Sequence, residues 1–128
     1  MTQHPRPLSP HLQVYRWQIT MAMSIFHRIT GVALAIAALG LAIWLIALAG
    51  SDALHAQVSA LLASLPGQVV LIAASAGLIY HLLNGIRHLI WDAGRGMSIP
   101  AVYRGGYAVI VLTVLLTAGI WLLAAVRT

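Results

Sequence analysis

A histidine inside a long apolar stretch is the residue of this sequence best suited to carry chemistry. His81 lies about seven residues before His88, which together with Arg87 marks the polar end of that stretch. At a rise of about 1.5 Å per helical residue, His81 is therefore roughly 10 Å inside the apolar region. An unpartnered polar group in such surroundings is costly, so the imidazole needs a partner.

Small residues accompany this histidine on one helical stripe. Residues three and four positions apart share a helix face, and here they are Ala74, Gly77, His81, Gly85 and His88. Because glycine has no Cβ, this face lets a flat macrocycle approach, with His81 as axial ligand to its iron. The alternative is a seam of small residues between two helices, with His81 hydrogen-bonded across it. The pattern alone leaves both interpretations open.

A second polar cluster lies near the start of the first apolar stretch. Ser24, His27, Arg28 and Gly31 are three or four residues apart and share one face. An arginine costs roughly 2.5 to 3.5 kcal/mol at the middle of a membrane and less near its edge. It either extends to the interface as a simple anchor, or forms a polar pocket with the serine hydroxyl. Such a pocket suits a carboxylate, for example a haem propionate, or the oxygen of a quinone that is being reduced.

The composition indicates which secondary-structure elements carry these polar residues. The chain has 128 residues, of which 61% are hydrophobic and 7% charged, more apolar surface than one soluble domain of this size can bury. A membrane span needs about 20 apolar residues. Three stretches qualify, and their non-alternating pattern favours helices over a β-barrel. We predict an all-α membrane protein with a single domain over residues 1–128 and transmembrane helices at about 29–49, 68–91 and 107–126.

The seven basic residues are all arginines, and six of them sort to one side of the predicted membrane. By the positive-inside rule the N-terminus and the second connection are cytoplasmic, and the C-terminus is periplasmic. The high pI of about 10.9 is therefore a signal of topology and not of nucleic-acid binding. Trp44 and Trp121 are expected near the outer side. The six arginines are Arg6, Arg16, Arg28, Arg87, Arg95 and Arg104.

The connections carry their own signals. Three prolines predict an extended cytoplasmic arm over residues 1–13, and the helical pattern begins at about Val14. After Ser51, a plausible N-cap, apolar residues at helical spacing predict a short amphipathic helix on the outer surface, ending before Pro66 and Gly67. Two glycines and Pro100 predict a structured turn in the second connection. The apolar residues of the predicted amphipathic helix after Ser51 are Leu54, Val58, Leu61, Leu62 and Leu65.

Two absences narrow the possible functions. The chain has no cysteine, so it supplies no thiolate or iron–sulfur ligand. Its two acids, Asp52 and Asp92, both lie outside the deep part of any predicted span, which weakens the alternative of a small proton-coupled transporter.

Three blocks of sequence give the chain a resemblance to a known family. They are residues 6–12 (RPLSPHL), 24–31 (SIFHRITG) and 81–92 (HLLNGIRHLIWD). With the glycine-containing connection and the third span, they make nearly the whole chain resemble the cytochrome b556 subunits of succinate dehydrogenase, the membrane anchors of respiratory complex II. The second and third blocks are specific in combination.

The resemblance implies a heterotetramer in which a flavoprotein oxidises succinate and an iron–sulfur subunit passes electrons to quinone. This chain would be one of two anchors, with no complete active site alone. By the family's pattern His81 supplies one axial ligand to haem b and the partner anchor supplies the other. Ser24 and Arg28 match quinone-site positions, His27 and Arg28 match residues near the haem propionates, and His88 is a further candidate haem contact.

Other functions stay open at this point. A fumarate reductase anchor would share the chemistry in the reverse direction, and an anchor without haem would be purely structural. The chain begins just before the first block with no targeting extension, which predicts the bacterial inner membrane over the mitochondrial one.

Overall fold

The computed structural model describes His11 and residues 15–127, and in this part of the chain it forms four α-helices and no strand. They are α1 (Ile19–Gly50), α2 (Asp52–Ala63), α3 (Leu65–Asp92) and α4 (Ile99–Arg127). Three of them, α1, α3 and α4, are long and apolar enough to cross a membrane. The predicted all-α fold with three spans is confirmed, whereas the predicted N-terminal arm lies, apart from His11, outside the described residues.

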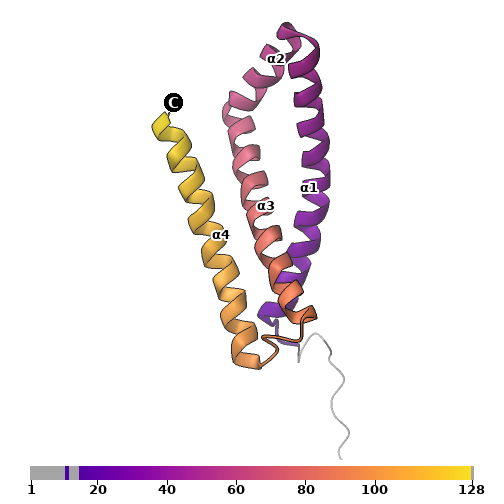
Figure 1. Cartoon of the computed structure of the whole chain (residues 1–128), viewed down its shortest axis with the longest axis vertical. Helices are drawn as coiled ribbons and strands as arrows, with labels where there is room; N and C mark the ends of the chain where they lie inside the picture. Colours follow the sequence, from indigo (N-terminus) through magenta and orange to yellow (C-terminus); the bar gives the residue numbers. More distant parts are fainter. Residues whose placement is uncertain (1–10, 12–14, 128) are drawn as a thin grey trace, which may run out of the picture.

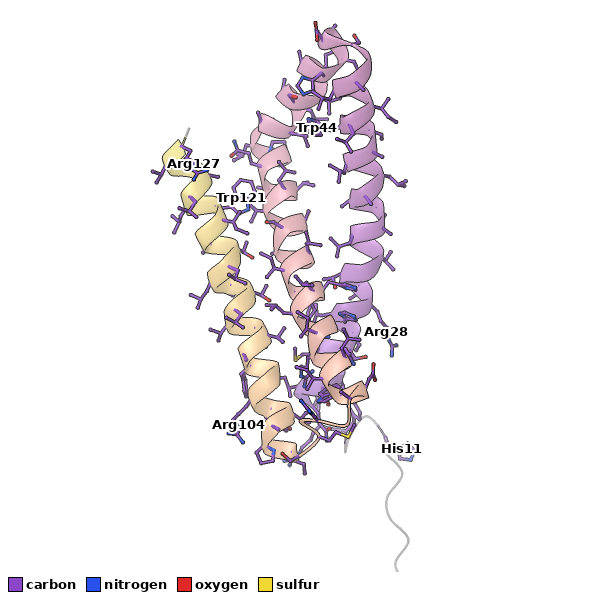
Figure 2. All side chains as sticks on the ribbon, in the orientation of Figure 1. His11, Arg28, Trp44, Arg104, Trp121 and Arg127 are labelled. Atoms are coloured by element: carbon purple, nitrogen blue, oxygen red, sulfur yellow. The ribbon has the colours of Figure 1, made fainter. Side chains whose placement is uncertain are left out.

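The three long helices run antiparallel, with α3 between α1 and α4 (Figure 1). The short helix α2 joins α1 to α3 at one end of the bundle, and a turn joins α3 to α4 at the other. The start of α1 and the end of α4 consequently lie at opposite ends, as three crossings require. Arg28 and Arg104 mark one end, and Trp121 and Arg127 lie toward the other (Figure 2).

Very few apolar side chains are buried within the chain itself. Met23, Ala47 and Val109 form the whole buried hydrophobic core of the described residues. Leucines, isoleucines and valines cover the outer faces of all three long helices. This surface requires lipid or a partner protein as its surroundings, because in water it would be a large apolar patch.

The starts of all three long helices differ from the sequence prediction, and α4 begins at Ile99 and not at about 107. Residues 15–18 are not helical, so α1 begins later than the predicted onset at about Val14. The short helix α2 ends before Pro66 and Gly67, as predicted, but α3 begins at Leu65 and not at about 68, so these two residues lie in its first turn. Proline fits there because the first turn of a helix leaves its N–H groups without intrahelical partners. The Ser64 hydroxyl caps this turn by accepting from the Gly67 N–H at 3.3 Å.

The predicted cap is confirmed, and the predicted turn is confirmed at its two glycines, whereas Pro100 lies in the first turn of α4 and not in the connection. The Ser51 hydroxyl accepts from the Leu54 N–H at 3.4 Å and begins α2. In the second connection Gly94 and Gly96 both have φ of +72°, a left-handed conformation that favours glycine. The Trp91 indole N–H donates to the Gly96 carbonyl at 3.3 Å and holds this turn against the end of α3.

Side-chain hydrogen bonds connect the long helices, and two of them involve aromatic residues. The Tyr80 hydroxyl on α3 donates to the Met23 carbonyl on α1 at 2.7 Å. The Trp121 indole on α4 donates to the Ser75 hydroxyl on α3 at 2.9 Å. Trp121, expected near the outer side of the membrane, therefore also links two helices. Such bonds give apolar helices a defined register where the hydrophobic effect is absent.

Candidate functional site

The two helices α1 and α3 bring His81 and His27 face to face. Their ring centroids are 3.9 Å apart and their planes differ by 8°. Both side chains are half-buried, and the Nδ1 atom of His27 is buried with no hydrogen-bond partner. The intramembrane histidine predicted to need a partner thus has one in the stack on α1.

Thr30 supplies a second partner for His81. Its hydroxyl oxygen lies 3.2 Å from the Nδ1 atom of the imidazole. The other ring nitrogen, Nε2, has no hydrogen bond to any residue that the structure describes. Stacking covers the face of the ring, whereas the nitrogen lone pair lies in the ring plane. One nitrogen of His81 is therefore held by α1 and the other is available for an external ligand or metal.

The small-residue stripe on α3 packs against α1. A Cβ added to Gly77 would lie 3.8 Å from the Thr30 Cγ2 atom, and one added to Gly85 would lie 4.0 Å from the His27 Cε1 atom. Farther along this seam, Gly77 and Ala74 line an apolar cavity of about 310 Å³ between the two helices. The stripe thus forms the helix–helix seam that the second interpretation predicts, and His81 is hydrogen-bonded across it while one of its nitrogens stays available.

His88 extends the cluster toward the end of the bundle. Its ring centroid is 5.5 Å from that of His27 and 5.1 Å from that of Trp91, and the His88 and Trp91 planes are nearly perpendicular, at 88°. Even so, within the described residues no group of three or more His, Cys, Asp or Glu side chains could hold a metal ion. The described residues therefore offer single histidines, and not a cluster of protein ligands, to a metal or cofactor.

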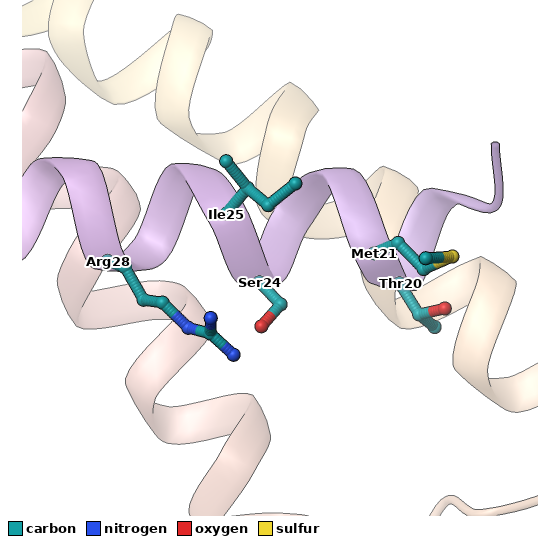
Figure 3. Close-up of a pocket in the computed structure, with 5 residues that line it drawn as sticks. All are labelled: Thr20, Met21, Ser24, Ile25 and Arg28. Atoms are coloured by element: carbon teal, nitrogen blue, oxygen red, sulfur yellow. The ribbon is translucent and has the colours of Figure 1, made fainter. Parts of the chain in front are cut away.

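Ser24 and Arg28 line a shallow hollow on α1. The hollow has a volume of about 370 Å³ and is bordered by the side chains of Thr20, Met21, Ser24, Ile25 and Arg28. Figure 3 shows the serine hydroxyl and the guanidinium on the same side of the helix. Arg28 is exposed and has no ion pair with any residue in the described part of the chain. A hydroxyl donor and an uncompensated cation are thus presented together, on a surface to which only one helix contributes.

Arg87 has a role that sequence reasoning missed. From the sequence, Arg87 is counted only among the arginines on the cytoplasmic side. In the structure its side chain is buried, with 7% of its surface exposed. Its guanidinium lies 4.0 Å from the centre of the Trp91 ring and donates to the Val102 carbonyl on α4 at 2.9 Å and to the Asn84 Oδ1 atom at 3.4 Å. The signal was present, because Asn84, Arg87 and Trp91 are three and four residues apart on one helix face.

Comparison with known proteins supplies the context for this geometry. Residues 2–120 match the family model described as the succinate dehydrogenase/fumarate reductase transmembrane subunit. The chain is 47% identical over 116 residues to the succinate dehydrogenase cytochrome b556 subunit of Rickettsia felis, which covers 91% of this chain and 90% of that protein. It is 41% identical over 119 residues to the mitochondrial succinate dehydrogenase cytochrome b560 subunit of Sus scrofa, which covers 90% of this chain and 69% of that protein.

The human mitochondrial cytochrome b560 subunit is similar to the same degree, with 41% identity over 117 residues. Relatives therefore come from both bacteria and mitochondria. These matches confirm the resemblance that the three sequence blocks predict.

Proposed function

Because this chain belongs to the family of transmembrane subunits of succinate dehydrogenase and fumarate reductase, we propose that it is an electron-transfer anchor of a succinate:quinone oxidoreductase. In this proposal it binds haem b together with a second anchor and forms part of the site where quinone is reduced. It has no complete active site alone. The main support for this proposal is that a chain with this family match has an intramembrane histidine, His81, whose Nε2 atom has no hydrogen bond within the described residues.

The residues around His81 fit a haem. Relatives named cytochrome b imply that group, and one axial ligand per anchor needs one available imidazole nitrogen. His81 meets this requirement, because Thr30 and the stack on His27 hold the ring while Nε2 has no bond within the described chain. His27, with its unpartnered buried Nδ1 atom, is the neighbouring group suited to donate to a propionate, and Arg28 and His88 are further candidates. When bound, haem supplies one-electron storage.

The hollow on α1 is the proposed part of the quinone site. Ser24 can donate to a carbonyl oxygen, and Arg28 can stabilise negative charge on that oxygen without losing its own proton. Both line the same hollow, and Arg28 has no ion pair with an acid in the part of the chain that the structure describes. All the lining residues come from α1, so the remaining walls must come from partner chains.

The proposed partners are a second membrane anchor, an iron–sulfur subunit and a flavoprotein, with lipid around the spans. The family description also covers fumarate reductase, whereas the relatives named above are all succinate dehydrogenase subunits, which favours the succinate-oxidising direction. The proposed location is the bacterial cytoplasmic membrane, with the arginine-rich end of the bundle facing the cytoplasm.

The test uses the detergent-extracted complex. Mass spectrometry should identify the soluble partners, and a reduced-minus-oxidised spectrum should contain a b-type haem signal. His81→Ala should lose or shift that signal while succinate oxidation with a soluble acceptor continues, because that chemistry belongs to other subunits. His55→Ala is the matched control, since His55 lies on α2 at the other end of the bundle and bonds Ser59. An unchanged spectrum in His81→Ala would remove the ligand assignment.

A further inference from the structure

The hydrogen-bond geometry of Thr30 bears on which nitrogen of His81 carries the proton. The threonine hydroxyl has a single hydrogen, and two backbone carbonyls of its own helix lie within reach, Phe26 at 2.8 Å and His27 at 3.0 Å. Both are closer than the His81 Nδ1 atom, at 3.2 Å. Since carbonyl oxygens only accept, the hydroxyl donates its hydrogen to them and offers a lone pair to the histidine.

We propose that Thr30 is a positioning residue that fixes His81 as the tautomer protonated on Nδ1, with the lone pair on Nε2 ready to bind haem iron. This inference rests on the proposed haem-binding function. An Nδ1–H that donates to an oxygen both orients the ring and raises the basicity of the other nitrogen. The bond crosses from α1 to α3, so it also sets the position of the ring relative to the first helix.

Gly31 allows the same ring to come close. A Cβ at this position would lie 3.2 Å from the His81 Cε1 atom and 3.8 Å from Nδ1. The imidazole is thereby held on its Nδ1 edge by Thr30 and on one face by His27, and it lies against the bare backbone of Gly31. These contacts leave Nε2 as the nitrogen that has no partner on α1.

The test replaces Thr30 in the full complex by valine, which keeps the branched shape and removes the hydroxyl. Thr113→Val is the matched control, because among the described residues the Thr113 hydroxyl on α4 bonds only the Val109 carbonyl of its own helix. Thr30→Ser should restore the bond. Haem retention and the haem midpoint potential are measured in each assembled preparation, independently of turnover.

We expect Thr30→Val to weaken haem affinity by about 10- to 100-fold, the usual effect of losing a hydrogen-bond partner of a ligating histidine. Its midpoint potential should shift upward, because a less basic ligand stabilises the oxidised iron less. Thr30→Ser and Thr113→Val should match the unmodified complex. Thr30→Ala gives the same comparison if Thr30→Val does not assemble.

Different results would contradict the positioning role of Thr30 and the proposed haem-binding function. If the unmodified complex binds haem and the valine and alanine variants keep its retention and potential, Thr30 does not position His81. The same conclusion follows if Thr30→Ser behaves like Thr30→Val. If the unmodified complex contains no haem, the proposed function fails, and this inference fails with it.

Discussion

Replacing Arg28 by leucine should slow quinone reduction more than replacing Ser24 by alanine. The serine can offer a neutral hydrogen bond, whose net value is about 0.5 to 1.5 kcal/mol. At 1.36 kcal/mol per tenfold in rate, Ser24→Ala should cost roughly 2- to 13-fold. Two unit charges 4 Å apart interact by about 4 kcal/mol at an effective dielectric constant of 20, which sets the ceiling for Arg28 near 10³-fold.

The structure places the expected value below that ceiling. Arg28 is exposed on a hollow that only α1 lines, so water screens part of its charge. The charge that develops on a quinone oxygen is also partial. Halving the interaction to about 2 kcal/mol gives roughly a 30-fold loss for Arg28→Leu. Arg28→Lys should retain part of the rate, because it keeps the charge and loses the planar fork.

The assay compares quinone-linked turnover with soluble-acceptor turnover in one assembled preparation, after haem content has been matched. Arg104→Leu is the control for loss of a positive charge, since Arg104 lies at the same end of the bundle on α4 (Figure 2). If Ser24→Ala and Arg28→Leu both keep full haem and unmodified quinone kinetics, the hollow is not the quinone site. Arg28 is then an interfacial anchor, the alternative that the sequence left open.

Three further predictions follow from the topology and the helix contacts. A reporter fused after Thr128 should be active only outside the cytoplasm, and activity inside would overturn the assigned orientation. Gly31→Ala should shift the haem spectrum, because its Cβ would lie 3.2 Å from the His81 ring, whereas Gly40→Ala on the same helix meets nothing within 4 Å and should be silent. Trp121→Phe should lower the stability of the membrane-embedded fold by about 0.6 to 1.7 kcal/mol through its lost bond to Ser75, and an unchanged denaturation midpoint would show that this bond contributes nothing.

The three spans were predictable because lipid imposes one simple requirement on the backbone. Any segment that crosses must satisfy its N–H and C=O groups internally, so length and hydropathy are enough to identify it. The helix ends were less predictable, since they depend on local polar contacts. Pro66 and Gly67 correctly predicted that the preceding helix ends before them, but not that Ser64 caps the turn that contains them and that α3 already begins at Leu65. A proline in the first turn of one helix and a proline just after the end of another occur in similar local sequence, so composition alone does not tell them apart.

The candidate site was predictable only as far as a single helix allows. The spacing on α3 places His81 among small residues, and the spacing on α1 places Ser24 beside Arg28. No periodicity states which residue of α1 faces His81, because that depends on the register and crossing of two helices. Thr30 was therefore missed, although it lies within the second sequence block and approaches the imidazole to 3.2 Å.

Arg87 and Arg28 lie near the same end of the bundle, and their surroundings, not their residue type, indicate which has a structural role and which is suited to bind a ligand. Arg87 is 7% exposed, its two terminal nitrogens donate to Asn84 and Val102, and Trp91 lies against its guanidinium, although its Nε atom is buried without a partner in the described residues. The Arg87 guanidinium therefore holds α3 to α4. Because this chain already supplies its contacts, it is poorly suited to bind a ligand. Arg28 is exposed and has no ion pair within the described chain, so its charge is uncompensated. Since a cation at a membrane boundary is costly without an anion or water, the group that completes its surroundings must come from outside this chain.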